Sequence, residues 1–425
     1  MAKLASFVQR KKDTFALNRL VYDAYRFIMY HKVPIESFPL QTYVSALLFS
    51  PTRSLIRRLF THEAPTWVTI LPSIQDDWDA CLQTLEGHSD EVQSVVFSHD
   101  SNLLISGSLC EVKIWDAVSG QCLQTLRPEI PEDIISVAFS YDSKQLAAVL
   151  SDGTVYIWNV IDDKCLLTLE WTASTRVQRT LRGSINFSLD SAQLVSTHHS
   201  KLAVWDLSKS KCPKILEGHS DNIISVSFSG DSKRLASASN NGSIKIWDVD
   251  SGKCIKTHEL DRRFESVAFF RDLTWIISSA LHNDEILIWD RNSGERLQTF
   301  NKAATSLALT HDSMQLASAS YDSTVEIWDV NSGECLQTFR GHSAGIYSLS
   351  FSRDSTHLAS ASRDRTIKIW DLSQGQVSQR QGDDKSSSES ITLSVDSTRL
   401  ALLGRNVIEI WDVQNGKCLH TLEGR

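Results

Sequence analysis

The stretch FSRDSTHLASASRDRTIKIWD, residues Phe351–Asp371, contains the pattern from which this chain is built. Apolar and polar residues alternate in three short runs, which are separated by polar clusters at Asp354–Ser355 and at Arg363–Arg365. Alternation with a period of two, interrupted by turn-forming residues, predicts three consecutive β-strands. The third strand ends on the pair Trp370–Asp371.

The same pattern recurs eight times, each time with a strand that ends on tryptophan. The spacings between successive tryptophans are 43, 47, 42, 42, 39, 42 and 41 residues, and an aspartate in the first turn precedes each by 15 to 17 residues. A repeat of about forty residues with Trp-Asp endings predicts the blades of a β-propeller, each a four-stranded antiparallel sheet. The tryptophans are Trp115, Trp158, Trp205, Trp247, Trp289, Trp328, Trp370 and Trp411.

The predicted fold class is mostly β, with a propeller over residues 79–425 and a small α-helical segment over residues 1–78. A lone outer strand at Ala80–Leu85 precedes eight three-strand sets, each followed by an outer strand of its own. Because an isolated repeat leaves a face unburied, eight complete sets favour one ring of eight blades. A ring of seven blades with a displaced repeat is the alternative.

The first 78 residues have helical rather than strand periodicity. Apolar residues recur at helical spacing over Asp13–Tyr30, and shorter helices are expected over Gln41–Phe49 and Ser54–Thr61. Thr52 is a candidate N-cap for the last of these. The basic residues of the segment are expected to form solvated helix faces.

Composition indicates an ordinary globular chain of 425 residues, with 41% hydrophobic residues and a net charge of −8. A net negative charge argues against a general nucleic-acid-binding protein. The sequence has no apolar run of membrane-spanning length and no signal peptide, so a cytoplasmic, monomeric propeller is expected. Seven of the eight cysteines repeat one strand position, so reduced thiols are expected rather than disulfides or a metal site.

Polar residues at fixed distances from Trp370 predict a buried hydrogen-bonded set. His342, Ser360 and Asp364 lie 28, 10 and 6 residues before it. We expect the indole N–H to donate to the serine, the serine to one histidine nitrogen, and the other histidine nitrogen to the aspartate. A near copy comprises His219, Ser237, Asn241 and Trp247.

The same residue types occur in hydrolase triads. Here, however, they recur as partial copies in other repeats, which is expected of a stabilising device and not of a catalytic one. We therefore predict no catalytic residue, no metal, no cofactor and no enzymatic activity.

These spacings resemble those of WD-repeat propellers over Ala80–Arg425. The segment YDAYRFIMYHKVPIESFPLQTYVSALLFSPTRSLIRRLF resembles the junction that precedes the propeller in fungal NACHT–WD-repeat proteins, which are NOD-like (STAND) signalling NTPases. The resemblance implies a ligand-sensing propeller joined to the end of a NACHT-associated helical linker. The sequence contains no G-x-x-x-x-G-K-[ST] motif, so the NTPase domain is absent and a truncated gene or gene model is expected.

The predicted function is a non-catalytic scaffold that binds other proteins, of unspecified identity, through turns that vary between blades. Tyr347 and Arg363 are the preferred anchors, because Tyr and Arg are common at interfaces. Two alternatives are an organelle adaptor resembling fungal mitochondrial division WD-repeat adaptors and, third, an enzyme with an unrecognised site. The candidate partner-binding residues are Asn222, Asn240, His282, Tyr321, Tyr347, Arg363 and Arg365.

Overall fold

The computed structural model forms two compact units. One comprises residues 80–376, and the other comprises residues 1–79 together with residues 377–425. The residues described are 15–31, 35, 46–47, 49–60, 62, 76–129, 132–162, 164–171, 183–208, 213–259, 263–269, 275–280, 285–290, 295–372, 390–393, 399–403, 407–412 and 417–423.

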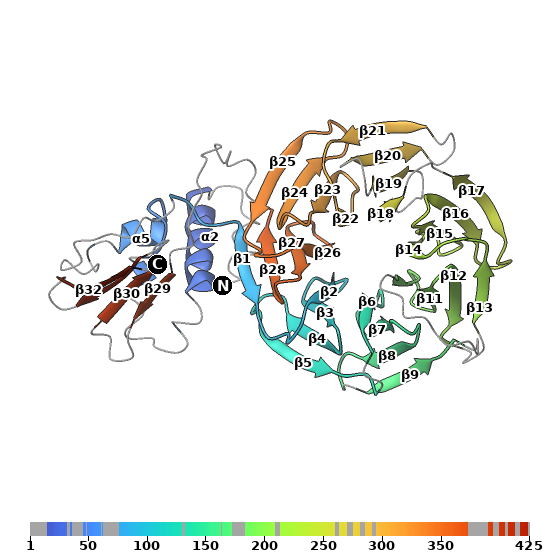
Figure 1. The fold of residues 1–425 in the computed structure, drawn as a ribbon, viewed down its shortest axis with the longest axis horizontal. Helices are drawn as coiled ribbons and strands as arrows, with labels where there is room; N and C mark the ends of the chain where they lie inside the picture. The colour runs from blue at the N-terminus through green and yellow to red at the C-terminus, as the bar shows by residue number, and fades with distance from the viewer. Residues whose placement is uncertain are drawn as a thin grey trace. The chain divides into compact units, whose positions relative to one another are not determined.

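The unit of residues 80–376 is a ring of seven four-stranded antiparallel sheets, the blades of a β-propeller (Figure 1). The first strand of each blade lies nearest the centre of the ring and the fourth lies at its circumference (Figure 1). Blades 1 to 3 consist of β2 (Val92–Phe97), β3 (Leu103–Ser108), β4 (Glu111–Asp116), β5 (Cys122–Leu126), β6 (Ile134–Phe139), β7 (Gln145–Leu150), β8 (Val155–Asn159), β9 (Cys165–Leu169), β10 (Ile185–Phe187), β11 (Gln193–His198), β12 (Lys201–Asp206) and β13 (Lys214–Glu217). Blades 4 to 7 consist of β14 (Ile223–Phe228), β15 (Arg234–Ser239), β16 (Ser243–Asp248), β17 (Cys254–Glu259), β18 (Phe264–Phe269), β19 (Trp275–Ala280), β20 (Ile286–Asp290), β21 (Arg296–Phe300), β22 (Ser306–Leu309), β23 (Gln315–Ala319), β24 (Thr324–Asp329), β25 (Cys335–Arg340), β26 (Ile346–Phe351), β27 (His357–Ser362), β28 (Ile367–Asp371) and β1 (Cys81–Leu85).

The ring closes through β1, which pairs antiparallel with β28 as the outer strand of blade 7. Thr84 lies opposite Lys368, and Lys368 Nζ donates a hydrogen bond to Thr84 Oγ1 at 2.8 Å. The preference for eight blades is therefore wrong, and the seven-bladed alternative is correct. The eighth repeat forms a separate sheet in the other unit.

Strand chemistry explains why β1 completes blade 7. The chain that follows Trp370 offers QVSQRQ at residues 376–381, in which Val377 is the only apolar residue. By contrast, β1 provides Leu82 and Leu85, which are 8% and 3% exposed. Burial of an aliphatic side chain contributes about 2 kcal/mol, so β1 is the better outer strand.

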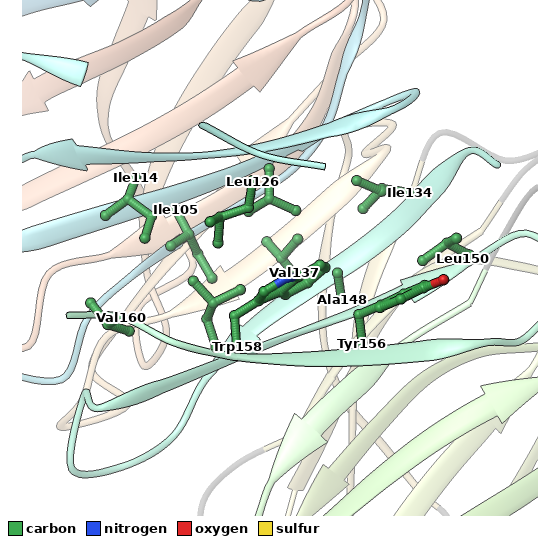
Figure 2. Packing of buried hydrophobic residues seen from close by; sticks show 12 residues of the cluster. Ile105, Ile114, Leu126, Ile134, Val137, Ala148, Leu150, Tyr156, Trp158 and Val160 are labelled. Carbon is green, nitrogen blue, oxygen red and sulfur yellow. The ribbon is translucent and has the colours of Figure 1, made fainter. Parts of the chain in front are cut away.

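Apolar side chains fill the space between neighbouring blades. In Figure 2, Ile105, Ile114 and Leu126 of blade 1 lie on one side of such a cluster. Val137 and Trp158 of blade 2 lie on the other side, and the Trp158 ring is only 3% exposed. Because each blade buries a face against the next, the repeats stabilise one another and not only themselves.

Serine hydroxyls on the inner strands join neighbouring blades. Across the closure, the backbone N–H of Val95 donates to Ser348 Oγ at 3.2 Å, and that of Phe97 donates to Ser350 Oγ at 3.1 Å. Val137 N–H donates in the same way to Ser94 Oγ between blades 1 and 2, at 3.2 Å. These hydrogen bonds provide acceptors for backbone N–H groups that point toward the neighbouring blade. Such groups have no acceptor on a strand of their own sheet.

The aspartate that recurs in the first turns stabilises the turn in blades 1, 2, 3, 4, 6 and 7. In blade 3, Ser188 Oγ donates to Asp190 Oδ1 at 2.6 Å, and the N–H of Ala192 donates to the same oxygen at 3.0 Å. These hydrogen bonds, first that from Ser188, lower the pKa of Asp190 below its ordinary value. Ser191 adopts a φ of 57°, and its hydroxyl accepts the N–H of Tyr141 from blade 2 at 2.9 Å.

Four cysteines on the outer strands of the propeller are free thiols that lie at the surface. Cys122, Cys165, Cys254 and Cys335 are exposed, so they do not act as buried small hydrophobes. In Cys122 the sulfur is 3.5 Å from the carbonyl oxygen of Gln124 in its own strand. The repeated position therefore lies on the circumference of the ring.

The other unit contains α2 (Phe15–Tyr30), α5 (Leu55–Leu59) and a sheet of β29 (Ser390–Leu393), β30 (Arg399–Leu403), β31 (Val407–Asp412) and β32 (Lys417–Glu423). Buried Asp23 of α2 accepts hydrogen bonds from Trp78 Nε1 at 2.7 Å and from Ser54 Oγ at 2.8 Å. The N-cap of α5 is Ser54 and not Thr52, because Ser54 Oγ accepts the N–H of Arg57. Most of the helix expected over Gln41–Phe49 lies outside the described residues.

In the part of the chain that the structure describes, no helix could span a membrane. Neither α2 nor α5 combines the length and the apolar character that crossing a bilayer requires.

Candidate functional site

The strand order of a blade divides the turns of the propeller between two faces. The links into the first strands and the turns between second and third strands lie on one face, which we call the upper face. The turns between first and second strands, and between third and fourth strands, lie on the lower face. The predicted partner-binding residues that the structure describes belong to the upper face.

Three side chains meet on the upper face where blade 7 closes against blade 1, and Tyr321 of blade 6 lies near them. Arg363 Nε donates to Glu91 Oε1 at 2.7 Å, and Tyr347 OH donates to Glu91 Oε2 at 3.2 Å. Tyr321 lies beside Gly345, where an added Cβ would be 3.2 Å from Tyr321 Cδ1. We call Glu91, Tyr321, Tyr347 and Arg363 the seam cluster.

The seam cluster is held in place and also open to solvent. The Arg363 N–H bonds to the carbonyl of Gly345 at 2.9 Å, which ties the second turn of blade 7 to the link that enters β26. The Tyr321 residue is 59% exposed, and the Arg363 side chain is 65% exposed. An exposed aromatic ring and an exposed guanidinium of fixed position are suited to contact a protein surface.

Glu91 also determines the electrostatics of this cluster. Burial, and then the adjacent Glu91 carboxylate, raise the pKa of Tyr347 above its ordinary value. The hydrogen bond and the charge of Glu91 also raise the pKa of Arg363. At neutral pH the cluster therefore presents a neutral phenol next to an ion pair.

The other predicted face residues lie elsewhere. Asn222 is exposed in blade 4, where its carbonyl accepts the N–H of Asn240 at 2.8 Å and its Oδ1 is 3.3 Å from His199 Nδ1. Arg365 is exposed in the second turn of blade 7 with a φ of 67°. His282 lies outside the described residues. The structure thus brings Tyr321, Tyr347 and Arg363 together, but not the two asparagines with them.

The hydrogen-bonded set of blade 7 forms a continuous chain beneath the upper face. Trp370 Nε1 donates to Ser360 Oγ at 2.8 Å, and that oxygen is 2.7 Å from His342 Nε2. His342 Nδ1 is 2.8 Å from Asp364 Oδ2. Gly341 precedes the histidine with a φ of 155°, and an added Cβ there would lie 3.3 Å from the Trp370 ring.

Asp364 is the charged end of this chain. Burial alone would raise the pKa of Asp364, but hydrogen bonds from His342 and Thr366, followed by that from the Ser343 N–H, hold it well below its ordinary value. The carboxylate is therefore ionised at neutral pH and orients the histidine.

Blade 4 differs from the expected set in one residue. Trp247 Nε1 donates to Ser237 Oγ at 2.8 Å, which is 2.7 Å from His219 Nε2. The other histidine nitrogen contacts Ser243 Oγ at 2.7 Å. Asn241 instead donates from Nδ2 to Ser220 Oγ at 2.7 Å.

Blade 1 fills the same place with an acid that sequence reasoning missed. His88 Nδ1 is 3.2 Å from Glu111 Oε1, and its Nε2 is 2.6 Å from Ser106 Oγ. Glu111 and Ser243 both lie four residues before their tryptophans, as Thr366 does in blade 7. The shared offset of four residues was the available signal, and a prediction based only on the offset of six residues does not include it.

The serine of these sets is engaged and enclosed. In blade 7, Ser360 is 0% exposed and His342 is 7% exposed, so no substrate reaches the hydroxyl without opening the blade. Within the described part of the chain, no group of three His, Cys, Asp or Glu residues is placed to hold a metal ion. The chemistry available to the sets is hydrogen bonding within the blade.

Comparison with protein families agrees with this architecture. The model "WD domain, G-beta repeat" matches residues 79–116, 120–159, 210–248, 294–329 and 333–371. The propeller therefore contains WD repeats. These matches include blades 1, 2, 4, 6 and 7, which contain both the seam cluster and the buried histidine sets.

Curated relatives match parts of the chain. The Vegetative incompatibility protein HET-E-1 of Podospora anserina is 46% identical over 102 residues, 24% of this chain and 8% of that protein. CCR4-associated factor 4 of Saccharomyces cerevisiae is 31% identical over 153 residues, 36% of this chain and 19% of that protein. WD repeat-containing protein SL1-17 of Schistosoma mansoni is 31% identical over 166 residues, 39% of this chain and 52% of that protein. The chain therefore spans at most about half the length of these relatives.

Proposed function

We propose that this protein is a non-catalytic interaction scaffold whose upper face binds a protein partner through the seam cluster. The observation that carries the proposal is the combination of exposed Tyr321 with Arg363, which Glu91 holds in one orientation. A side chain that is already fixed loses less conformational entropy on binding, so these residues are suitable anchors. WD propellers in general bind other proteins, which supports the same reading.

The absence of catalysis is part of this proposal. The polar sets that contain serine, histidine and an acid are explained by hydrogen bonds to buried tryptophans, and they recur in incomplete form around the ring. A reacting serine would need a free hydroxyl beside a substrate pocket. The enzyme alternative has no observation in its favour.

We also propose that the bound partner is a ligand sensed in signalling. The support is the 46% identity to part of a fungal vegetative incompatibility protein together with the sequence resemblance to fungal NACHT–WD-repeat proteins. The site of action proposed is the cytosol. Imaging of the tagged chain tests this point: diffuse cytosolic signal supports it, whereas concentration on an organelle would favour the adaptor alternative.

Quantitative affinity capture tests the proposed face. The double variant Tyr347→Ala with Arg363→Ala should reduce capture of the partner at least tenfold, because it removes the fixed anchor of the seam cluster. Leu123→Ala is the matched control, since Leu123 is 50% exposed on the outer strand β5. If capture by the double variant equals that by the control, and both unfold at the wild-type temperature, the upper face is not the binding face.

A further inference from the structure

The lower face has a hollow of its own at the mouth of the central channel. A cavity of about 260 Å³ lies there, with a wall that includes Phe97, Phe139, Phe187 and Phe228 from the ends of the first strands of blades 1 to 4. Its lining also includes Ser140, Ser188 and other polar groups of the first turns. The lining of the hollow therefore combines apolar and polar side chains, as the lining of ligand pockets does.

One position of the first turns, the residue before the aspartate, lines this hollow in several blades and differs in size between them. The residue before the turn aspartate is His99, Tyr141, Leu189, Gly230, His311 and Arg353 in blades 1, 2, 3, 4, 6 and 7. The first five of these line the cavity. Blade 4 contributes no side chain at this position, because it has Gly230, so the position occupies less of the cavity in blade 4 than in its neighbours.

Arg353 of blade 7 contacts two residues that line the cavity, one in blade 1 and one in blade 2. Its Nη1 is 2.8 Å from His99 Nδ1 and 3.3 Å from Tyr141 OH, and its guanidinium carbon lies 5.5 Å from the Tyr141 ring centre. The His99 and Tyr141 rings are 3.6 Å apart between centres. Three turns from three consecutive blades thus hold one guanidinium at the mouth of the cavity.

The side-chain partners of this guanidinium are an imidazole and a phenol. Among the residues that the structure describes, no carboxylate forms an ion pair with Arg353, and the nearby turn carboxylates bind their own turns: Asp100 accepts from Ser98 Oγ, and Asp354 accepts from Ser352 Oγ, both at 2.6 Å. A positioned cation without an acid partner favours a ligand that brings a carboxylate, since charge-assisted bonds to Arg are stronger than neutral ones.

We propose that the lower mouth binds a peptide segment of a partner protein that places one apolar side chain in the cavity and an adjacent carboxylate on Arg353. The size of the cavity favours a single side chain, because pockets that enclose a whole drug-sized ligand measure about 300–1,000 Å³. The carboxylate then remains at the rim, where Arg353 is exposed. This site is separate from the seam cluster of the upper face.

Fluorescence polarisation with short labelled peptides tests the site in the full chain. Four peptides carry Leu, Ile, Phe or Trp followed by Glu, and four matched peptides carry Gln in place of the Glu. At least one acidic peptide should bind, with its Gln partner at least tenfold weaker. Arg353→Met should weaken that binding at least tenfold, while Arg353→Lys should retain part of it.

Filling the cavity provides an independent variant. Gly230 has no positive φ, so Gly230→Leu is compatible with the turn, and its side chain should weaken peptide binding at least tenfold by occupying the hollow. Arg127→Met, at an arginine whose side chain is 75% exposed, is the matched control and should bind as the wild type does. The proposal is overturned if no acidic peptide binds, or if binding survives both Arg353→Met and Gly230→Leu in chains that melt normally.

Discussion

Blades 7 and 2 have the same four strands, yet they bury their tryptophans in different ways. In blade 7 the Trp370 indole donates to Ser360, which leads through His342 to Asp364. In blade 2 the serine position is Ala148, and the Trp158 ring stacks on Tyr156 with centres 5.4 Å apart. Both tryptophans are at most 3% exposed.

The comparison separates what the fold requires from what a blade adds to it. Both blades keep the same short turn, because Asp152 bonds to Thr154 as Asp364 does to Thr366. Of these two blades, only blade 7 has a histidine that contacts the aspartate of that turn. Apolar burial is therefore enough to form a blade, and the polar set must be fully paired wherever it is present.

The largest expected effect is from Ser360→Ala in blade 7. The change leaves the Trp370 N–H and one His342 nitrogen without their hydrogen-bond partner. Because Ser360 is 0% exposed, we expect a loss of about 3 kcal/mol in the free energy of unfolding. The reverse exchange in blade 2, Ala148→Ser, should cost less than about 1 kcal/mol because the new hydroxyl can accept the Trp158 N–H. Chemical denaturation measures both, and equal losses would remove the distinction between the blades.

A smaller effect is expected at the aspartates that the two blades share. Asp364→Asn should cost about 2 kcal/mol, because it weakens the bonds to both His342 and the turn, whereas Asp152→Asn should cost about 1 kcal/mol for the turn alone. Because the pKa of Asp364 is lowered on folding, its contribution is present above the ordinary pKa and is lost as the pH falls. Denaturation at pH 7 compares the two variants. The expectation is contradicted if Asp152→Asn lowers the free energy of unfolding more than Asp364→Asn does.

Blade 4 extends the comparison to pH. Burial lowers the pKa of His219 to about 4 from an ordinary 6.5, so protonation favours the unfolded chain. The contribution of His219 to the free energy of unfolding is present above about pH 6.5. It should decrease by about 1 kcal/mol between pH 6.5 and 5.5. His219→Gln should lower stability at pH 7 but flatten the pH dependence over that interval. A variant with the wild-type slope would show that His219 does not titrate on unfolding.

The repeated features of the fold were predictable because each is recorded several times in the sequence. Trp370 and Asp354 are the clearest examples, since equivalents recur in phase and each has a local role in its strand or turn. The number of blades in the ring depends instead on a choice between distant segments. The strand pairing in the structure shows that β28 pairs with β1, which contains Leu82 and Leu85 and precedes the repeats. It does not pair with the polar chain that follows it.

The candidate site was predictable in part for the same reason. Tyr347 and Arg363 were predicted as residues of varied turns, and the structure places Tyr347 at the start of β26 instead. Glu91 becomes their neighbour only when blade 7 closes against blade 1. Glu111 and Ser243 were missed because a different strand position substitutes for the aspartate. Such compensation between positions is spatial, and one copy of the repeat does not reveal it.

Closure by β1 underlies both the seam cluster and the lower mouth, and a cross-strand disulfide measures it directly. Thr84→Cys with Lys368→Cys should form a disulfide in the intact chain, because these residues are directly opposite in the β1–β28 pairing. Thr84→Cys with Glu409→Cys tests the eight-bladed ring, in which β1 would pair with β31 at the equivalent position. Peptide mapping under non-reducing conditions should find the first bond and not the second. A bond to position 409, with free thiols at 84 and 368 in the first variant, would contradict the seven-bladed closure.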